Sequence, residues 1–456
     1  MSVEHFDLVI VGSGSGNSLV TPDFDDWKIA IVEEGTFGGT CLNVGCIPTK
    51  MFVYPAEVTS SAREQARLGL HGAPPVADWP AIRDRIFGRI DAISLGGRDY
   101  RAGTGSPNVT LFETHAEFSG ARELKLSTGQ TITADRIVLA AGSRAFVPPM
   151  LVESGVPFHT SDTVMRIDEL PERVIVLGGG YIAAEFANIF SAFGSHVTVV
   201  SRSPLLRDHD REVIGHFTDL VRDRWHLHTE HLPTSFTQDA GGIHVRLDDG
   251  SVVTGDLLLV AIGRVPNGDR LNLGAAGVDV HPDGRVVVDE YQRTTADGVW
   301  ALGDVSTEHQ LKHVANHEER VVAHNLAHPD DLRASDHRFV PSAVFTHPQL
   351  ATVGITEEQA KASGRRYVAH TQFYGSTAYG WAMVDETSLC KLIADPHTGQ
   401  LLGAHLMGEQ ASTLVQPLIQ AMSFGLGVRE MARGQYWIHP ALTEVVENAL
   451  LSLELD

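Results

Sequence analysis

Residues 174–187, VIVLGGGYIAAEFA, decide the fold of this chain. An apolar run is followed by three glycines and then by residues that favour a helix. This is the pattern of a buried strand, a tight glycine turn and the start of a helix. Gly178, Gly180 and Ala183 match the full G-x-G-x-x-G/A spacing of a dinucleotide-binding turn. The stretch therefore predicts a parallel α/β nucleotide-binding domain.

A second stretch of the same kind stands near the N-terminus. Residues 6–11 form an apolar run that ends in GSGSGN, which again predicts a strand, a glycine turn and a helix start. Gly12 and Gly14 allow a tight turn in which a helix N-terminus meets a pyrophosphate, and Glu33 ends the next apolar run, where a carboxylate can bind ribose hydroxyls. The third position is Asn17, and a lone G-x-G also occurs in plain strand-to-helix turns. Together the two stretches indicate a duplicated nucleotide-binding unit.

In the nucleotide-binding unit that begins at residue 174, the residues after the second expected strand indicate which nicotinamide nucleotide binds. The apolar run 197–200 ends in Ser201 and Arg202 without a carboxylate, and Arg207 follows. A guanidinium suits a 2′-phosphate, which a carboxylate at this place would repel. The pattern favours NADPH over NADH, and the alternative is that these arginines are only solvated surface residues.

Further strands are expected on both sides of the second unit. Short apolar runs predict strands over 111–117, 124–127, 137–141, 257–261 and 286–288. From Pro341 onward the sequence changes to period-2 runs, followed by helical patterns over 413–422 and 442–453. This change predicts a separate α+β domain at the C-terminus.

Composition excludes several classes of protein. The 456 residues carry a formal net charge of -22, whereas nucleic acids and anionic membranes attract clusters of positive charge. No apolar run reaches the roughly 20 residues that cross a bilayer, and the opening MSVEHFDLVIV lacks the basic start of a signal peptide. We therefore expect a cytoplasmic protein with no nucleic-acid or membrane partner.

Two of the three cysteines lie in GGTCLNVGCIPTK, residues 38–50. Four residues separate Cys41 from Cys46, so the two thiols can meet in a turn that enters a helix, whose N-terminus lowers the pKa of a thiol. The alternatives are a chance pair or a zinc site, which needs further ligands at suitable spacing. The pair indicates redox chemistry, while Cys390, in an apolar run, is expected to be a buried structural thiol.

These motifs resemble those of the FAD-dependent pyridine nucleotide-disulfide oxidoreductases, the family of glutathione reductase and dihydrolipoamide dehydrogenase. The resemblance covers essentially the whole chain, because AAG (140–142), IGRVPN (262–267), ALGDV (301–305) and IHPALTE (438–444) follow in the family's order. It implies an α/β fold with two Rossmann-like domains, for FAD and NADPH, and a C-terminal α+β dimerisation domain. The implied segments are 1–166 (FAD, with the redox disulfide), 167–288 (NADPH), 289–337 (completing the FAD domain) and 338–456 (interface).

The resemblance also implies the route of the electrons. Hydride from NADPH reaches FAD, and the electrons pass to a Cys41–Cys46 disulfide. Cys46 is expected to lie against the flavin as the charge-transfer thiolate, while Cys41 attacks the substrate disulfide. His439, oriented by Glu444, protonates the leaving thiolate and serves the disulfide of the partner subunit in a homodimer. An HP dipeptide with no such role, marking only a turn, is the alternative.

Other residues are assigned by the same resemblance. Lys50 and Glu185 resemble the family's buried ion pair beside flavin N5, and the helix that begins near Lys312 points its positive end at the pyrimidine side of the flavin. Asp304 is expected to bind the ribityl chain, unless it is only a helix cap or turn residue. The expected FAD residues are Gly12, Gly14, Glu33, Thr40, Lys50, Ala141, Gly142 and Asp304. The expected NADPH residues are Gly178, Gly180, Ala183, Ser201, Arg202, Arg207 and Gly263.

Four stretches resemble the branch of the family that reduces mycothione, the disulfide of mycothiol: GSGSGNS, KMFVYPAEV, FHTSDTVMRI and RGQYWIHPALTEVVENALL. Glutathione reductases carry arginines on the first helix for the glycyl carboxylates, where residues 20–23 here read VTPD. Mercuric and large thioredoxin reductases need another C-terminal redox pair, and no cysteine follows Cys390. The alternatives are NAD-linked oxidation of dihydrolipoamide, which Ser201 and Arg202 disfavour, and a flavin-binding interaction protein without catalysis.

Histidine clusters raise the question of a metal. His226, His228 and His231 lie close together in the sequence, and His313 and His317 have i,i+4 spacing. The first group falls in a polar strand-and-turn stretch and the second on the helix assigned to the flavin. We therefore expect no metal site.

Overall fold

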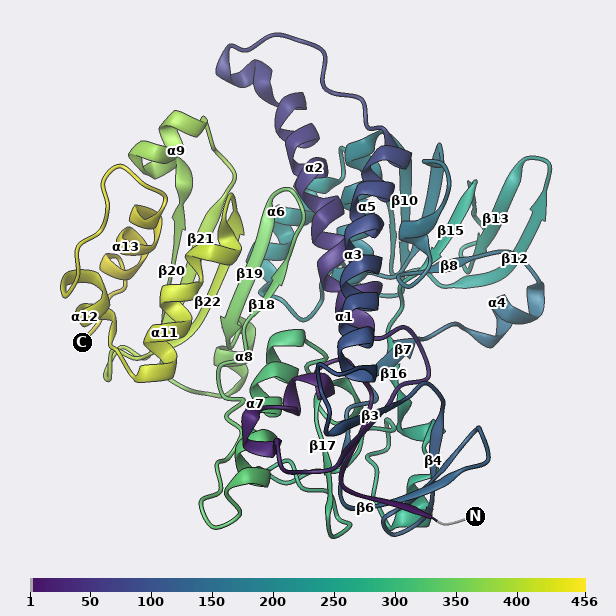
Figure 1. Cartoon of the computed structure of the whole chain (residues 1–456). Helices are drawn as coiled ribbons and strands as arrows, with labels where there is room; N and C mark the ends of the chain where they lie inside the picture. The colour runs from purple at the N-terminus through teal and green to yellow at the C-terminus, as the bar shows by residue number, and fades with distance from the viewer. Residues whose placement is uncertain (1–2) are drawn as a thin grey trace. The chain divides into compact units, whose positions relative to one another are not determined.

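A computed structural model describes residues 3–456; Met1 and Ser2, with which the first expected segment begins, lie outside the described residues. The chain forms two compact units (Figure 1). The first contains Met1–Thr49, Arg83–Phe146 and Gly263–His337, and the second Lys50–Ile82, Val147–Ile262 and Arg338–Asp456. The division into four segments stays a prediction, and the two units cross its boundaries at 166 and 288.

A mostly parallel sheet forms the core of the first unit. Its parallel strands are β3 (Val109–Phe112), β2 (Ile29–Val32), β1 (Glu4–Val11), β6 (Thr131–Leu139) and β17 (Val299–Ala301). β5 (Glu123–Leu126) and β4 (Ala116–Gly120) continue it as antiparallel strands. Every residue of β2 is buried, as apolar runs predict for strands covered on both faces. The carboxyl ends of β1, β2 and β6 meet at one edge, where nucleotides bind in such sheets.

Shorter elements complete the first unit. β7 (Ser143–Ala145) pairs with β16 (Arg264–Pro266) in a separate two-stranded sheet. The expected strand 111–117 is divided between β3 and β4, and 286–288 forms only isolated bridges. The helices are α1 (Gly39–Asn43), η5 (Asn267–Arg270), η6 (Leu273–Ala276), η7 (Gly303–Val305) and α7 (Lys312–Ala327). α2 (Cys46–Arg63) and α3 (Trp79–Ala102) each belong partly to both units.

The chain after β1 differs from the prediction. Only two short 3₁₀ helices, η1 (Gly16–Leu19) and η2 (Pro22–Phe24), stand where a helix was expected to begin. Pro22 is the physical reason, because a proline disfavours helical backbone in the residue before it, and Thr21 is extended with φ −104° and ψ 169°. The expectation of a helix N-terminus at this glycine turn was therefore wrong.

The second unit contains the other parallel sheet. Its strand order is β11 (Trp225–Thr229), β10 (His196–Ser201), β9 (Arg173–Leu177), β15 (Leu257–Val260) and β8 (His159–Thr160). α5 (Tyr181–Phe193) follows the glycine turn directly, as the sequence predicts. β12 (Pro233–Asp239), β13 (Gly242–Leu247) and β14 (Val252–Gly255) form a separate three-stranded antiparallel sheet, whose apolar residues share a core with the parallel sheet. Nearby helices are η3 (Gln65–Leu68), α4 (Pro149–Ser154), η4 (Val164–Arg166) and α6 (Arg211–Val221).

The C-terminal part of the second unit is the predicted α+β domain. Its antiparallel sheet has the order β18 (Ser342–Val344), β19 (Gln349–Gly354), β22 (Leu401–Gly408), β21 (Leu389–Ala394) and β20 (Val368–Phe373). The yellow helices α11 (Gln416–Phe424) and α13 (Thr443–Leu451) pack against these strands (Figure 1). The other helices are α8 (Glu357–Ala362), η8 (Tyr374–Ser376), α9 (Ala378–Met383), α10 (Ala411–Leu414) and α12 (Val428–Arg433). The predicted fold class is confirmed.

Cys390 lies in the core of this domain. Its side chain on β21 is completely buried, and burial raises the pKa of the thiol to about 12. A thiol with so high a pKa is protonated and unreactive at neutral pH. The expectation of a structural cysteine is confirmed.

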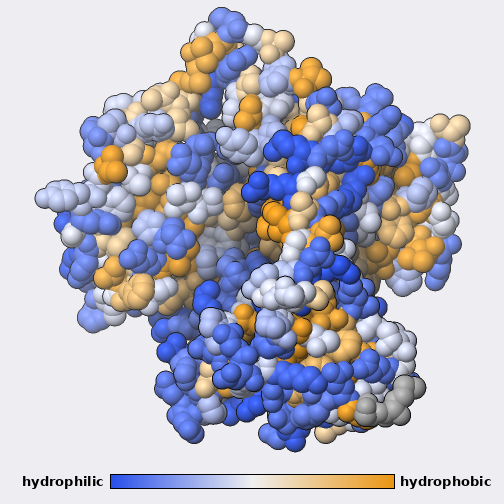
Figure 2. All heavy atoms as spheres, in the orientation of Figure 1, coloured by the Kyte–Doolittle hydropathy of each residue, from blue (hydrophilic) through white to orange (hydrophobic). Residues whose placement is uncertain are grey.

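The face of the molecule seen in Figure 2 is largely polar. Figure 2 shows hydrophilic residues over much of the visible face, with apolar residues in separate patches. None of the helices formed by residues 3–456 combines the length and the hydrophobicity needed to span a membrane.

A buried ion cluster ties three elements of the second unit together. Lys391, only 2% exposed on β21, lies 3.0 Å from Asp210, 2.8 Å from Glu212 and 2.6 Å from Glu357. Burial opposes the charge of Asp210, but the N–H of Glu357 and the ammonium of Lys391 lower the pKa of its carboxyl. Asp210 also caps α6 by accepting from two of its backbone N–H groups. The cluster therefore links α6, α8 and β21.

Replacing Lys391 should destabilise this unit. Lys391→Met leaves the buried carboxylate of Asp210 without its cation, and an uncompensated buried charge costs about 3 kcal/mol or more. We expect a lower midpoint of thermal unfolding, followed by circular dichroism. Lys361→Met, on the exposed face of α8, is the matched control and should unfold like the wild type. Equal midpoints for the two variants would show that the cluster contributes no net stability.

Candidate functional site

The first glycine loop brings backbone segments too close for any side chain. Gly12 has φ +106°, and a Cβ atom there would lie 2.3 Å from the carbonyl oxygen of Ala140. Gly39 has φ +70°, and its Cβ would lie 2.6 Å from the Cα of Gly14. Only glycine fits these positions, and the resulting cradle of bare backbone suits the close approach of a pyrophosphate.

The carboxylate of Glu33 is fixed at the end of β2. One oxygen accepts hydrogen bonds from the N–H of Ser13 at 2.8 Å and from its hydroxyl at 2.7 Å, and the other accepts from the N–H of Gly35 at 2.8 Å. The hydroxyl of Ser13 also accepts from the N–H of Gly38 at 2.9 Å. A carboxylate held in this way can bind the ribose hydroxyls of the FAD adenosine. The role of Ser13 had no signal beyond its place in the glycine loop.

Asp304 belongs to a polar group at the carboxyl side of the same sheet. It lies in η7 and accepts a 2.7 Å hydrogen bond from the hydroxyl of Ser143, which accepts one of 2.7 Å from Nε of Arg264. Neither η7 nor α7 has a side-chain cap, so the alternative of a capping aspartate is not observed. Ser143 and Arg264 were not among the expected site residues, although the first follows the AAG turn and the second lies within IGRVPN.

Three of the remaining expected FAD residues lie in the turn after β6 and on α1. The carbonyl oxygens of Ala141 and Gly142 accept from the side chain and backbone of Asn267, at 2.8 and 3.0 Å. Thr40 is exposed on α1. The glycine cradle, the fixed Glu33 carboxylate and Asp304 together provide polar groups of the kind that an FAD molecule requires.

The two cysteines meet as the sequence predicts. Cys41 lies on α1 and Cys46 is the first residue of α2, and both are in the reduced thiol form. A hydrogen bond from Cys46 lowers the pKa of Cys41 to about 7 against the opposing effect of burial. The ammonium of Lys312 and the backbone N–H groups of Ile47 and Cys46, at the start of α2, act in the same direction. Cys41 is therefore partly a thiolate at neutral pH and suited to attack a disulfide.

Lys50 and Glu185 form the expected ion pair. Nζ of Lys50 lies 2.5 Å from Glu185, whose side chain is 6% exposed. The other oxygen of Glu185 accepts from the N–H of Phe345 at 3.0 Å, and Lys50 lies over the ring of Phe345 at 4.4 Å from its centroid. The ammonium is thus held on α2, one helical turn after Cys46.

His439 and Glu444 also pair. Nδ1 of His439 lies 2.6 Å from Oε1 of Glu444, which fixes the orientation of the imidazole and leaves Nε2 for a substrate. The side chain of His439 is 70% exposed, while Glu444 is mostly buried at the start of α13. This is the arrangement of a general acid held by a carboxylate.

The second glycine turn matches the first in construction. Gly178 has φ +130°, and its Cβ would lie 2.1 Å from the carbonyl oxygen of Ala261. Gly180 faces open space at the N-terminus of α5, and Ala183 is buried within that helix. These features suit a dinucleotide phosphate at the start of a 13-residue helix.

The other residues expected to bind NADPH differ in their exposure and in the contacts that they form. Arg202 is exposed immediately after β10, whereas Ser201 is buried and its hydroxyl donates to the carbonyl of Ser203 at 2.8 Å. Arg207 is exposed, with a loose contact of 3.6 Å to Asp208. Gly263 belongs to the first compact unit, where its carbonyl accepts from the N–H of Phe146.

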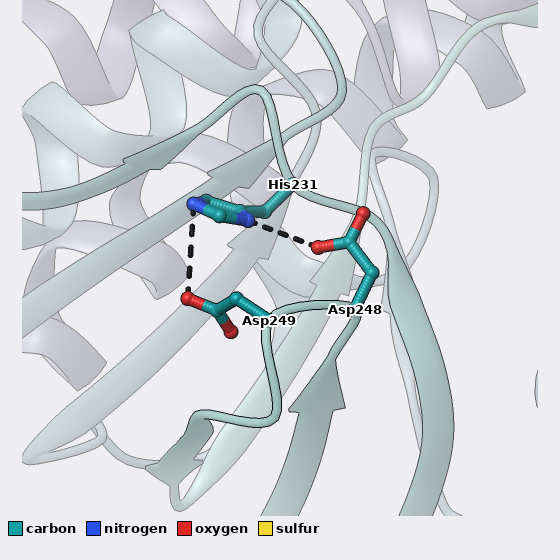
Figure 3. A group of neighbouring side chains, drawn as sticks. All are labelled: His231, Asp248 and Asp249. Atoms are coloured by element: carbon teal, nitrogen blue, oxygen red, sulfur yellow. Dashed lines mark hydrogen bonds and ion pairs between the residues drawn. The ribbon is translucent and has the colours of Figure 1, made fainter.

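One residue of the first histidine group, His231, forms ion pairs. His231 stands between two aspartates, with Nδ1 at 2.9 Å from Asp248 and Nε2 at 3.8 Å from Asp249 (Figure 3). The hydrogen bond to Asp248 raises the pKa of His231. Each ring nitrogen of His231 faces a different carboxylate, and the three side chains offer one ligand atom each within 4.8 Å of one another.

The reactivity of Cys41 should follow its lowered pKa. In reduced enzyme we expect alkylation by iodoacetamide to follow one ionisation with a pKa of about 7 at Cys41, while Cys390 stays unmodified. Cys46→Ala removes the hydrogen bond that lowers the pKa of Cys41 most, and should shift this ionisation to higher pH. Mass spectrometry over a pH series measures both sites. An unchanged midpoint in the variant would contradict the proposed hydrogen bond.

Comparison with known proteins agrees with this geometry. Residues 6–319 match the family model "Pyridine nucleotide-disulphide oxidoreductase", and residues 340–450 match the model of its dimerisation domain. Mycothione reductase of Mycobacterium tuberculosis (strain ATCC 25618 / H37Rv) is 54% identical over 461 residues, covering 99% of this chain and 100% of that protein. Glutathione reductase of Burkholderia cepacia is 32% identical, covering 96% and 97%.

A solved structure supports the same conclusion. The HOCl-induced flavoprotein disulfide reductase RclA from Escherichia coli superposes with a TM-score of 0.86 at 28% identity, covering 98% of this chain and 99% of its own. The predictions of an enzyme, of disulfide chemistry and of FAD with a nicotinamide nucleotide are confirmed. The dimerisation domain supports a homodimer, and the substrate is a small-molecule disulfide. The chain belongs to the FAD- and NAD(P)H-dependent pyridine nucleotide-disulfide oxidoreductases.

Proposed function

We propose that this enzyme reduces mycothione with NADPH. The observation that carries the proposal is the 54% identity, over nearly the whole of both chains, to a protein named mycothione reductase. In support, residues 20–23 contain no arginine, and Asp23 lies in η2 where the glutathione enzymes place cations for the glycyl carboxylates. A sugar-bearing disulfide without those carboxylates has no need of such cations.

The residues of this chain account for the chemistry at sulfur. Bound FAD, held by Gly12, Gly14, Glu33 and Asp304, would supply hydride acceptance from NADPH and two-electron reduction of the Cys41–Cys46 disulfide. The Cys41 thiolate then attacks one sulfur of the substrate, the substrate S–S bond breaks and a mixed disulfide forms. Cys46 next attacks Sγ of Cys41, which releases the second thiol and restores the disulfide.

A proton must reach the first leaving thiolate. His439 provides it from Nε2, because Glu444 holds Nδ1 and fixes the orientation of the ring. The exposure of His439, and of its neighbours Tyr436 at 102% and Ile438 at 75%, fits a loop that another protein surface covers. We therefore assign each His439 to the disulfide of the partner subunit.

Arg202 supports the choice of NADPH. It follows β10 directly, is exposed, and forms no ion pair with any carboxylate of residues 3–456. A free guanidinium at this strand end suits a 2′-phosphate. Ser201 contributes through its backbone position, since its hydroxyl faces Ser203. We place the enzyme in the cytoplasm, where NADPH is supplied.

The substrate assay tests the proposal directly. Purified holoenzyme is assayed with mycothione, glutathione disulfide and lipoamide, each with NADPH and with NADH. We expect kcat/KM for mycothione to exceed that for glutathione disulfide at least about a hundredfold, because unpaired polar groups in a buried site are strongly discriminated against. NADPH should be the better reductant, and Arg202→Ala should narrow its advantage. Comparable rates with glutathione disulfide would reject the substrate, while preference for dihydrolipoamide with NAD would move the enzyme to the alternative branch.

Loss of the proton donor should separate the two half-reactions. His439→Ala is expected to slow disulfide turnover roughly 10²–10⁴-fold, the usual loss when a general acid is removed. Stopped-flow reduction of the flavin by NADPH should stay near the wild-type rate. His397→Ala, an exposed histidine outside the site, is the matched control. Normal turnover in His439→Ala would remove this residue from the mechanism.

A further inference from the structure

The FAD loop lacks the usual source of positive charge for a pyrophosphate. In such loops the aligned peptide dipoles of a long helix sum at its N-terminus, next to the phosphates. Here the glycine loop enters η1, a single 3₁₀ turn of four residues, and Pro22 prevents its continuation. Few peptide dipoles are aligned, so the two negative charges of a buried pyrophosphate need compensation from elsewhere.

Lys312 brings an ammonium group to this loop. It is the first residue of α7, and its Nζ donates a 2.7 Å hydrogen bond to the hydroxyl of Ser15, between Gly14 and Gly16. Lys312 is half-buried and forms no ion pair with a carboxylate anywhere in residues 3–456. Its charge is therefore available to an anion that approaches the backbone of the loop.

Arg101 brings a second cation to the same loop. From the last turn of α3, its Nε donates to Oδ1 of Asn17 at 2.8 Å, Nη2 to the carbonyl of Asn17 at 3.2 Å and Nη1 to the hydroxyl of Ser106 at 2.8 Å. Within the described part of the chain no carboxylate pairs with it, and burial lowers the pKa of its guanidinium. Because its hydrogen-bond partners are all neutral, the positive charge of Arg101 is not neutralised within the protein and can attract an anionic ligand.

The contact with Arg101 gives a reason for the asparagine at position 17, where the fingerprint normally has glycine or alanine. A glycine in the third fingerprint position normally permits close packing of helix on strand. In this chain Gly16 has that task, because its Cβ would lie 2.7 Å from Cγ2 of Ile10 and 2.9 Å from Cβ of Ala140. Position 17 is thus free to carry a side chain, and the asparagine attaches the loop to Arg101.

We propose that two side-chain cations take the place of the helix N-terminus at the FAD pyrophosphate. Lys312 contacts the phosphates directly, at the position where its ammonium meets Ser15, and is a cofactor-binding residue. Arg101 is a positioning residue, which holds the loop through Asn17 and adds the second positive charge. The inference rests on the FAD site of the proposed function and is independent of the identity of the disulfide substrate.

The test is the affinity for FAD at different salt concentrations. Holoenzyme is diluted stepwise, and released FAD is followed by the recovery of its fluorescence. Lys312→Met should raise the Kd about tenfold or more at low salt, the size of effect expected for a lost charged hydrogen bond, and its Kd should depend less on salt. Lys312→Arg should restore most of the affinity and the salt dependence. Arg320→Met, an exposed cation on the same helix, should behave as the wild type.

Arg101 needs its own variants. Arg101→Gln retains hydrogen-bonding groups but removes the charge, and Asn17→Gly removes the attachment. Both should raise the Kd for FAD several-fold, and Arg101→Gln should also flatten the salt dependence. A wild-type Kd and salt dependence in both would overturn the role of Arg101.

A different result would reassign Lys312. If Lys312→Met binds FAD normally while the alkylation pKa of Cys41 rises, the lysine serves the thiolate and the phosphate role is rejected. Mycothione turnover at saturating FAD is measured in parallel. Retained turnover with unchanged FAD affinity rejects this inference alone, whereas failure of the wild type to reduce mycothione rejects the proposed substrate alone.

Discussion

The first turns of α2 set the position of the reactive groups. Cys46 begins the helix and donates to Cys41, and the free N–H groups of the same turn stabilise the negative charge on that sulfur. One turn later the side chain of Lys50 extends from the helix and pairs with Glu185. Because a helix fixes the rise between its residues, Cys46 and Lys50 are separated by about one turn along its axis. The redox pair depends on this rigid segment more than on the loops around it.

The two glycine turns show one solution used twice. Gly12 lies against the carbonyl of Ala140, and Gly178 lies in the same way against the carbonyl of Ala261. In both, the missing side chain lets the loop touch the end of the neighbouring strand. The turns then diverge, since the second continues into α5 and the first into a single turn. The same backbone device thus serves two sites with different sources of positive charge.

Much of this could be predicted from sequence because the signals are local. The glycine turns, the cysteine pair and the His439–Glu444 pair lie within short motifs whose spacing limits the geometry. Pro22 is also a local signal, because a proline disfavours helical backbone in the residue before it, and it interrupts the helix that the glycine pattern predicts. Other features join distant residues: Arg101 meets Asn17 across 84 positions, and no local pattern announces such a contact. Ser201 illustrates another limit, because the strand was predicted correctly while its hydroxyl turned to a backbone carbonyl.

The cluster around Lys391 has a consequence for how such enzymes can be recombined. Its carboxylates come from the start of α6 and the start of α8, while the lysine comes from β21, so residues on both sides of a tempting exchange boundary near 338 share one buried charge balance. A chimera that took its nucleotide-binding segment from one relative and its C-terminal segment from another would bury unpaired charges unless both parents carried compatible residues at these positions. Whether such a hybrid folds would then depend on the match between the two parents at the four positions of this cluster, more than on their overall sequence identity.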